Sequence, residues 1–246
     1  MKYYKFKFFI FFSTLFLLIS NLYSAQYWGD GVFVDIGFSS KNFVPKPVPL
    51  EGTIGFRREF NEIDIFSGFC FDNFSFDFSA SGVINPIKLN KYKLGLGYLS
   101  HFSFSYKTEY LSELFINDNV FFISNTFCGK KIENPLKINL SIGVDLKTTV
   151  QKLTNNRLSF FEPFPIFEFQ LVKSIKEKHE IMFRFATFDY LYFKGWLNTW
   201  WQFGYSYDFP KSFTFGTVIE LLYADQITLS GALNGYQCKL FLVYKF

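Results

Sequence analysis

A hydroxyl, an imidazole and two carboxylates lie close together in the middle of this chain. His101 and Ser103 are separated by one residue, and Glu109 and Glu113 follow them. A hydrolase combines these groups, with serine as the nucleophile, histidine as the base and a carboxylate that orients the histidine. Residues two apart on a strand project the same way, roughly 6–7 Å apart, so a direct bond between His101 and Ser103 is not favoured. We therefore expect polar side chains that fill space rather than a catalytic site.

Two families of outer-membrane enzymes use related groups. The His-x-Ser spacing at 101–103 resembles that of an outer-membrane lipid A deacylase family, but the asparagine-rich surroundings of that motif are absent. The omptin proteases are ten-stranded barrels that use paired acidic residues and a histidine near the outer rim. Here Asp189 and Asp225 fall near the outer ends of expected strands, whereas His179 falls at the opposite end. We expect no enzyme.

The cysteines also fail to form a chemical motif. Cys70, Cys128 and Cys238 are odd in number and widely spaced, without a CxxC pair or another metal-ligand spacing. We therefore expect neither a disulfide framework nor a metal site, and Cys238 reads as a small hydrophobic residue. Glycine-rich phosphate loops and nucleotide signatures are missing as well. We expect no cofactor.

Charge and composition narrow the class of protein further. The formal net charge is +4, and Lys2, Lys5 and Lys7 supply three of these charges, which leaves about +1 for the rest (4 − 3 = +1). Nucleic-acid binding needs a concentrated basic patch, so we expect no nucleic-acid partner. Hydrophobic residues make up 49% of the chain and aromatic residues 23%, with 38 phenylalanines. No apolar run long enough for a membrane-spanning helix follows the first 24 residues, so these side chains must fill a core or face lipid from strands.

Long segments of the chain alternate between apolar and polar residues with a period of two. In 136–150 one face carries leucine, isoleucine and valine, and the other carries Lys137, Ser141, Gly143 and Asp145. The segments 92–106, 199–209 and 213–223 repeat the pattern with aromatic residues. Glycine weakens a solvated strand but suits the inner wall of a small barrel. The pattern therefore predicts an all-β, antiparallel transmembrane β-barrel with an apolar exterior and a polar lumen.

The polar faces of these strands carry the candidate functional residues. We expect seven titratable side chains to line the lumen: Lys93, His101, Lys137, Asp145, Lys147, Glu220 and Lys239. Small barrels are filled by their own side chains, so these groups are expected to pair across the interior or contact water. In a narrow pore they would set ion selectivity instead.

The number of strands follows from the turns. We expect ten strands at 53–60, 63–79, 92–106, 119–128, 136–150, 158–172, 180–192, 198–209, 212–224 and 235–246. A shift of face at Asp72-Asn73 is interpreted as a bulge in 63–79. If it is a turn, and if 31–38 is a wall strand, the count becomes twelve. Either even count places both termini in the periplasm, with 107–119, 151–157, 194–198 and 224–234 outside.

The two ends of the chain indicate its destination. Residues 1–24 combine three lysines with an apolar run and predict a signal peptide, which leaves 25–246 as one barrel domain. The last strand, 236–246, resembles the terminal strand of bacterial outer-membrane β-barrels, in which alternating apolar positions and a final Phe are read by the assembly machinery. That resemblance assigns Tyr244 and Phe246 to the assembly signal. It implies the cell outer membrane, its lipids and the barrel assembly machinery as partners.

These features favour a structural role or a narrow solute channel, with a conductance well below that of a general porin. The alternative is a surface-binding protein that uses the loops 107–119 and 224–234, and an embedded hydrolase comes third. A soluble β-sandwich is the rival fold. On the face assignment above, Leu240→Arg is expected to be more damaging than Lys239→Ala, because Leu240 would face hydrocarbon.

Overall fold

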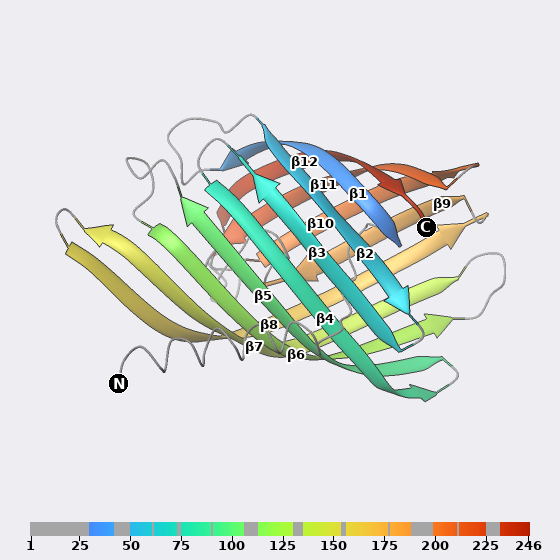
Figure 1. The fold of residues 1–246 in the computed structure, drawn as a ribbon. Helices are drawn as coiled ribbons and strands as arrows, with labels where there is room; N and C mark the ends of the chain where they lie inside the picture. The colour runs from blue at the N-terminus through green and yellow to red at the C-terminus, as the bar shows by residue number, and fades with distance from the viewer. Residues whose placement is uncertain are drawn as a thin grey trace.

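The computed structural model describes residues 30–41, 50–60, 62–72, 75–89, 91–105, 113–129, 135–153, 156–176, 178–187, 199–210, 212–224 and 232–246. These residues form an antiparallel barrel of twelve strands (Figure 1). The strands are β1 (Gly31–Lys41), β2 (Glu51–Phe60), β3 (Ile63–Phe71), β4 (Ser75–Leu89), β5 (Tyr92–Ser105), β6 (Glu113–Gly129), β7 (Leu136–Leu153), β8 (Asn156–Ile175), β9 (His179–Ala186), β10 (Thr199–Phe209), β11 (Phe213–Ala224) and β12 (Ala232–Tyr244). The predicted signal peptide at 1–24 lies outside the described residues.

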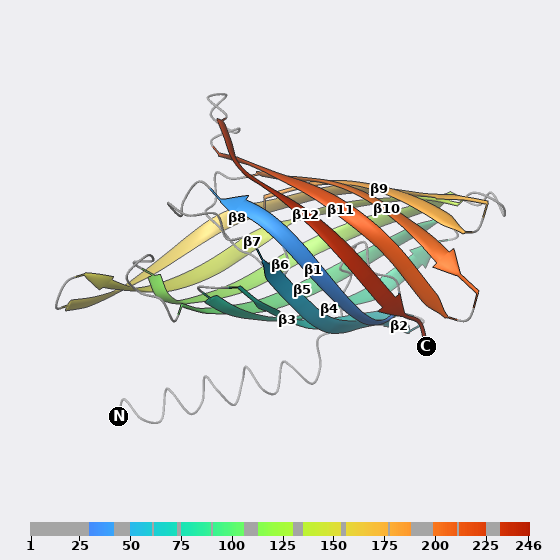
Figure 2. The same cartoon turned by 90° about the horizontal axis from the view of Figure 1, so that it is seen from above.

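Each strand pairs with its neighbour in sequence, and the first strand pairs with the last. The seam between β1 and β12 runs from Val32 opposite Tyr244 to Lys41 opposite Gly235 (Figure 2). Closure gives every strand a partner on both sides, which is the condition for a sheet in hydrocarbon. β8 extends past the end of β9, and its pairing with β9 runs only from Glu168 to Ile175. Among the described residues, no helix is long and apolar enough to cross a membrane.

The expectation of ten strands is wrong, and the alternative of twelve is confirmed. The face shift at Asp72 marks a chain reversal: Asp72 N–H donates to the carbonyl of Ser75 (3.1 Å), and Ser75 N–H donates to Asp72 Oδ1 (2.7 Å). The strand that follows is not short, because β4 continues to Leu89 past an irregularity between Ile84 and Ile87. The segment 31–38 forms most of the remaining wall strand, β1.

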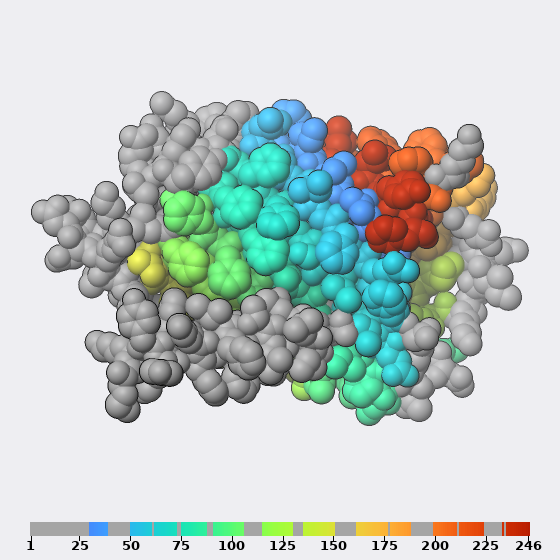
Figure 3. All heavy atoms as spheres, in the orientation of Figure 1, coloured from blue at the N-terminus to red at the C-terminus, as the bar shows by residue number. Residues whose placement is uncertain are grey.

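The exterior is apolar, as the alternation predicts. On β12 the outward series Tyr236, Leu240, Leu242 and Tyr244 is exposed, whereas Lys239 on the other face is buried. Outward side chains of the same kind cover the described strands, and Figure 3 shows the side formed by β2–β5. A continuous apolar band around a closed sheet is the surface of a transmembrane β-barrel.

The two ends of the barrel differ in their connections. At the end where the C-terminus lies, the strands are joined by two to six residues: 61–62, 90–91, 130–135, 176–178 and 210–212. The longest connection, 187–198, joins strand ends at the opposite end. Short periplasmic turns and longer extracellular loops are typical of such barrels. We therefore call the C-terminal end the periplasmic end and the other the outer end.

Inside the wall, inward glycines lie opposite large inward side chains of neighbouring strands. Phe122 stands directly across from Gly97 on one side and from Gly143 on the other, and Phe241 stands across from Gly216. A Cβ at any of these glycines would overlap the facing phenylalanine. The facing side chains therefore occupy the space that these glycines leave.

Candidate functional site

The lumen has an apolar layer between two polar layers. The order of inward residues along single strands shows this, starting from the periplasmic end. On β3 they are Asp64, Phe66, Gly68 and Cys70; on β5 they are Lys93, Gly95, Gly97, Leu99, His101 and Ser103; on β12 they are Val243, Phe241, Lys239 and Gln237. Along β5 charged groups flank glycines and Leu99, and β3 and β12 each carry a charged group on one side of their apolar residues. On β7 the middle is polar instead, because Asn139 and Ser141 are buried between Lys137 and Asp145.

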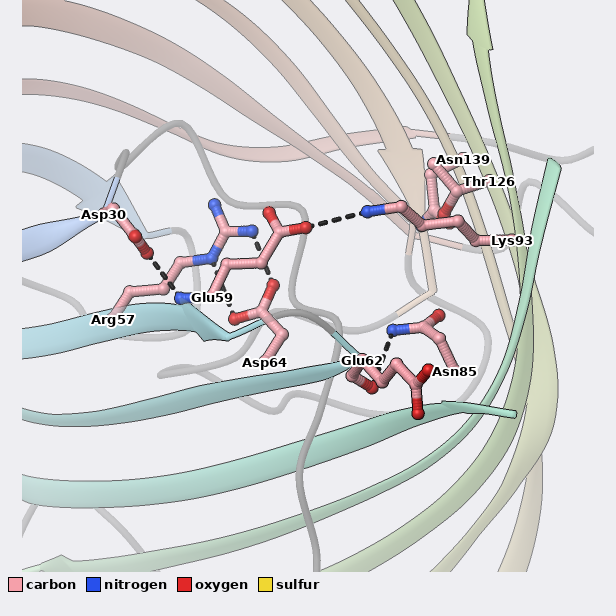
Figure 4. A network of polar contacts seen from close by, with 9 residues as sticks. All are labelled: Asp30, Arg57, Glu59, Glu62, Asp64, Asn85, Lys93, Thr126 and Asn139. Carbon is pink, nitrogen blue, oxygen red and sulfur yellow. Dashed lines mark hydrogen bonds and ion pairs between the residues drawn. The ribbon is translucent and has the colours of Figure 1, made fainter. Parts of the chain in front are cut away.

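The periplasmic layer is an ion-paired network (Figure 4). Arg57 of β2 donates to both oxygens of Asp64 on β3, at 3.2 Å from Nε and 2.6 Å from Nη2. Lys93 of β5 reaches Glu59 of β2 at 2.8 Å, across the two intervening strands β3 and β4. Lys137 of β7 lies among the same charges. Side chains from separate parts of the wall thus bridge the periplasmic mouth.

The apolar layer is made of buried side chains from both halves of the barrel. Its members are Phe33, Phe66, Val83, Leu99, Val120, Phe122, Ile166, Met182, Val218, Phe241 and Val243. The rings of Phe33 and Phe66 stack with centroids 5.8 Å apart. This layer was not predicted from the sequence. The signal that could have indicated it was the presence of the apolar residues Phe241 and Val243 on the otherwise polar face of the last strand.

The outer polar layer contains an ion triad beside the seam. The Lys239 ammonium on β12 lies 3.5 Å from Glu51 Oε1 on β2 and 3.4 Å from Glu220 Oε1 on β11. Gln237 donates to the second oxygen of Glu51 at 2.7 Å. All four side chains are buried. The lumen candidate Glu220 is therefore engaged with a cation.

Five inward side chains on β4–β7 form what we call the His101 cluster: Asp77, His101, Asp118, Asp145 and Lys147. His101 Nδ1 lies 2.8 Å from Asp118 Oδ2, and His101 Nε2 lies 3.2 Å from Asp77 Oδ1. A ring nitrogen that faces a carboxylate oxygen acts as the donor, and imidazole donates from both nitrogens only when it is protonated. Lys147 stands directly opposite Asp118 in the pairing of β7 with β6.

This geometry opposes the hydrolase interpretation. Both nitrogens of His101 are directed at aspartates, so neither is placed to take a proton from Ser103. His179 lies at the periplasmic end of β9, where Nδ1 contacts the Tyr205 hydroxyl at 2.8 Å. Asp189 and Asp225 lie outside the described residues. Among the described residues, no group of three or more His, Cys, Asp or Glu side chains could hold a metal ion.

Sequence reasoning also missed a buried pair on the opposite wall. Arg184 of β9 donates to Glu168 of β8 at 2.6 Å and to Gln202 of β10 at 2.9 Å. Arg184 alternates with Met182 and Ala186, so its inward direction was readable from the pattern; the identity of its partners was not.

The structure places the predicted site residues in three groups. Lys93 and Lys137 lie in the periplasmic layer, Glu220 and Lys239 lie in the ion triad, and His101, Asp145 and Lys147 come together in the His101 cluster. Tyr244 and Phe246 lie on the exterior at the periplasmic end, where Tyr244 packs on Phe213 with ring centroids 5.2 Å apart. The Arg58 guanidinium lies 5.3 Å from the ring of Phe246.

Comparison with known proteins adds the fold class. No family model matches the chain, and no curated protein matches it. Two solved structures are similar over 87% of the chain: the KdgM porin (8% identity, 99% of its own chain, TM-score 0.56) and the NanC porin (13% identity, 100% of its own chain, TM-score 0.62). At such identities the likeness shows the fold alone. The chain has the porin-like fold of an outer-membrane β-barrel.

Proposed function

We propose that the protein is a narrow outer-membrane channel for small polar solutes and that the apolar layer closes it at rest. The observation that carries this proposal is the sequence of layers in the lumen. Charged layers on both sides offer water and polar solutes a surface, whereas an apolar constriction gates by expelling water. A barrel with only a structural role would have no need of buried charged layers, since desolvating them is costly.

The channel must be narrow because side chains fill it. Barrels of about eight strands are filled by their own side chains, and water-filled pores appear at about sixteen. Twelve strands stand between these limits, and here the inward glycines that could widen the lumen are covered by side chains such as Phe122 and Phe241. We expect a small conductance from the wild-type protein.

The solute is not expected to be an acidic sugar chain. The KdgM porin has been solved in complex with disordered oligogalacturonate, which carries carboxylates. Eight carboxylates are buried among the described residues of this chain: Asp35, Glu51, Asp64, Asp77, Asp118, Asp145, Glu168 and Glu220. The buried cationic and imidazole side chains are fewer: Arg57, Lys147, Arg184, Lys239 and His101. A lumen with an excess of fixed negative charge repels anions and favours neutral or cationic solutes.

Single-channel recording in planar bilayers tests the proposal with two neighbouring residues of β6. Phe122 is 4% exposed and belongs to the apolar layer, whereas Phe121 is 43% exposed and faces outward. Phe122→Ala is expected to give larger and longer openings than the wild type, and Phe121→Ala is expected to conduct like the wild type. Heat-dependent gel mobility of each variant establishes that the barrel is folded.

Two results would contradict the proposal. Porin-like conductance from the wild type would mean that the lumen is open at rest. Equal conductance from the two alanine variants would mean that the apolar layer is not the barrier. The surface-binding alternative depends on loops that lie mostly outside the described residues, and no described contact favours it.

We also propose that membrane lipids and the barrel assembly machinery are partners of the exterior. Support comes from the apolar outer band and from the exposed aromatic side chains of Tyr244 and Phe246. Replacing both by serine is expected to reduce insertion while secretion continues. Phe209→Ser, which removes another exposed aromatic ring at the same end, is the matched control. Normal insertion of the double variant would contradict an assembly role for this pair.

A further inference from the structure

Asp145 is a buried carboxylate with one oxygen that accepts no hydrogen bond. Its side chain is 3% exposed, and Oδ1 accepts no hydrogen bond. Asp145 interacts with three charged neighbours, Asp118 on the adjacent strand β6, Lys147 and His101, and Oδ1 of Asp118 is also without a hydrogen-bond partner. The second oxygen of Asp118 is occupied by His101. Two inward carboxylates therefore face each other, each with an oxygen that no protein donor satisfies.

The charges of the His101 cluster do not balance. Asp77, Asp118 and Asp145 contribute three negative charges, and protonated His101 with Lys147 contributes two positive charges, which leaves one negative charge (−3 + 2 = −1). The other buried cations are engaged elsewhere, since Arg57 binds Asp64, Arg184 binds Glu168 and Lys239 binds two glutamates. An uncompensated charge out of water is costly, so the cluster as described calls for one more positive charge.

We infer that the His101 cluster binds one exchangeable monovalent cation between Asp118 and Asp145, and that this site makes the channel cation-selective. The selectivity part rests on the proposed function, whereas the binding part does not. A dedicated metal site uses three or more protein ligands, but two carboxylates bind a cation loosely. Loose binding suits a conduction site, because an ion must leave as readily as it enters.

Thermal unfolding of the purified barrel in detergent tests the binding. The wild type is expected to unfold at a higher temperature in sodium chloride than in N-methyl-D-glucamine chloride of equal ionic strength, with a saturable dependence on sodium. Asp145→Asn is expected to lose this dependence and still fold, because the amide can donate to Asp118. Asp208 lies near the periplasmic end of β10, where it pairs with Lys245, so Asp208→Asn makes the same chemical change away from the His101 cluster and is expected to keep the dependence.

Two outcomes would overturn the binding. One is a wild-type midpoint that is the same in both salts, and the other is an equal sodium effect in Asp145→Asn. If the midpoint depends on pH but not on sodium, a proton shared by the two aspartates replaces the cation.

Reversal potentials across a potassium chloride gradient test the selectivity in the wild type and in Phe122→Ala. The sign of the reversal potential is expected to show a preference for cations. Asp145→Asn is expected to reduce this preference, and Asp208→Asn is expected to leave it unchanged. A preference for chloride overturns the selectivity part. If even Phe122→Ala carries no current, the proposed channel function fails and the selectivity part fails with it; the sodium-dependent midpoint then decides the binding part alone.

Discussion

Removal of the Lys239 ammonium should be among the most damaging changes in this barrel. The side chain is 2% exposed, and its nitrogen lies 3.5 Å from Glu51 and 3.4 Å from Glu220. Lys239→Ala would leave two buried carboxylates without the cation they share. Breaking a buried ion pair by removing one partner costs about 3–5 kcal/mol, because the remaining charge stays out of water.

The next residue on the strand provides the comparison. Leu240 is 49% exposed and faces outward, so Leu240→Arg would place a cation against lipid. That change costs about 2–4 kcal/mol near the middle of the bilayer and less toward the interfaces. From the sequence we expected Leu240→Arg to be the more damaging of the two. We now expect the opposite order, because Lys239 is buried and paired with two glutamates.

Urea unfolding in lipid vesicles, followed by tryptophan fluorescence, measures both changes on one scale. Lys239→Ala should unfold at a lower urea concentration than Leu240→Arg. Lys239→Met combined with Glu51→Gln and Glu220→Gln should recover most of the loss, since no charge then remains unpaired. If Lys239→Ala unfolds at the wild-type midpoint, the triad is hydrated, and the inference of a packed outer layer is wrong.

Three further changes test the wall itself. Gly143→Ala should lower the free energy of unfolding by about 1–3 kcal/mol, because the new Cβ would overlap the neighbouring strand. Gly129→Ala is the control and should be tolerated, because the nearest atom to its Cβ would be 3.5 Å away. Equal urea midpoints for the two variants would contradict this prediction. Asp72→Ala should cost about 1 kcal/mol through loss of its 2.7 Å bond in the turn before β4, and no change would argue against that turn. Cys238 on the exterior should react with an apolar maleimide in the folded protein, whereas buried Cys70 should react only after unfolding; early labelling of Cys70 would misplace β3.

The fold class was predictable because period-two alternation is a local property. Each strand shows which side faces lipid, so the inward placement of Lys147 and Glu220 needed no knowledge of neighbours. The number of strands was harder, because a bulge and a turn both shift the face of the pattern by one residue. At Asp72 the two interpretations separate only when the pairing of β3 with β4 is known.

The partners of the lumen charges could not be predicted from single strands. Lys93 meets Glu59 across two intervening strands, and Lys239 meets Glu51 across the seam. Such contacts depend on how far each strand is staggered against the next, and this stagger is a property of the closed barrel. The sequence therefore predicted which residues face inward and left their pairing open.

The relation between glycines and rings connects the wall to the barrier in the lumen. Phe122 stands opposite a glycine on each side, and Phe241 stands opposite Gly216, so each ring lies against bare backbone instead of another side chain. Glycine weakens a strand, and the cost is offset when an aromatic ring covers it. The backbone hydrogen bonds between the strands do not depend on these rings. Truncating one of the two phenylalanines therefore removes part of the barrier while the strand pairing persists. A lumen built in this way can be closed by a thin apolar layer and opened by a small displacement of side chains, which is why we place the gate at the apolar layer rather than in the charged layers around it.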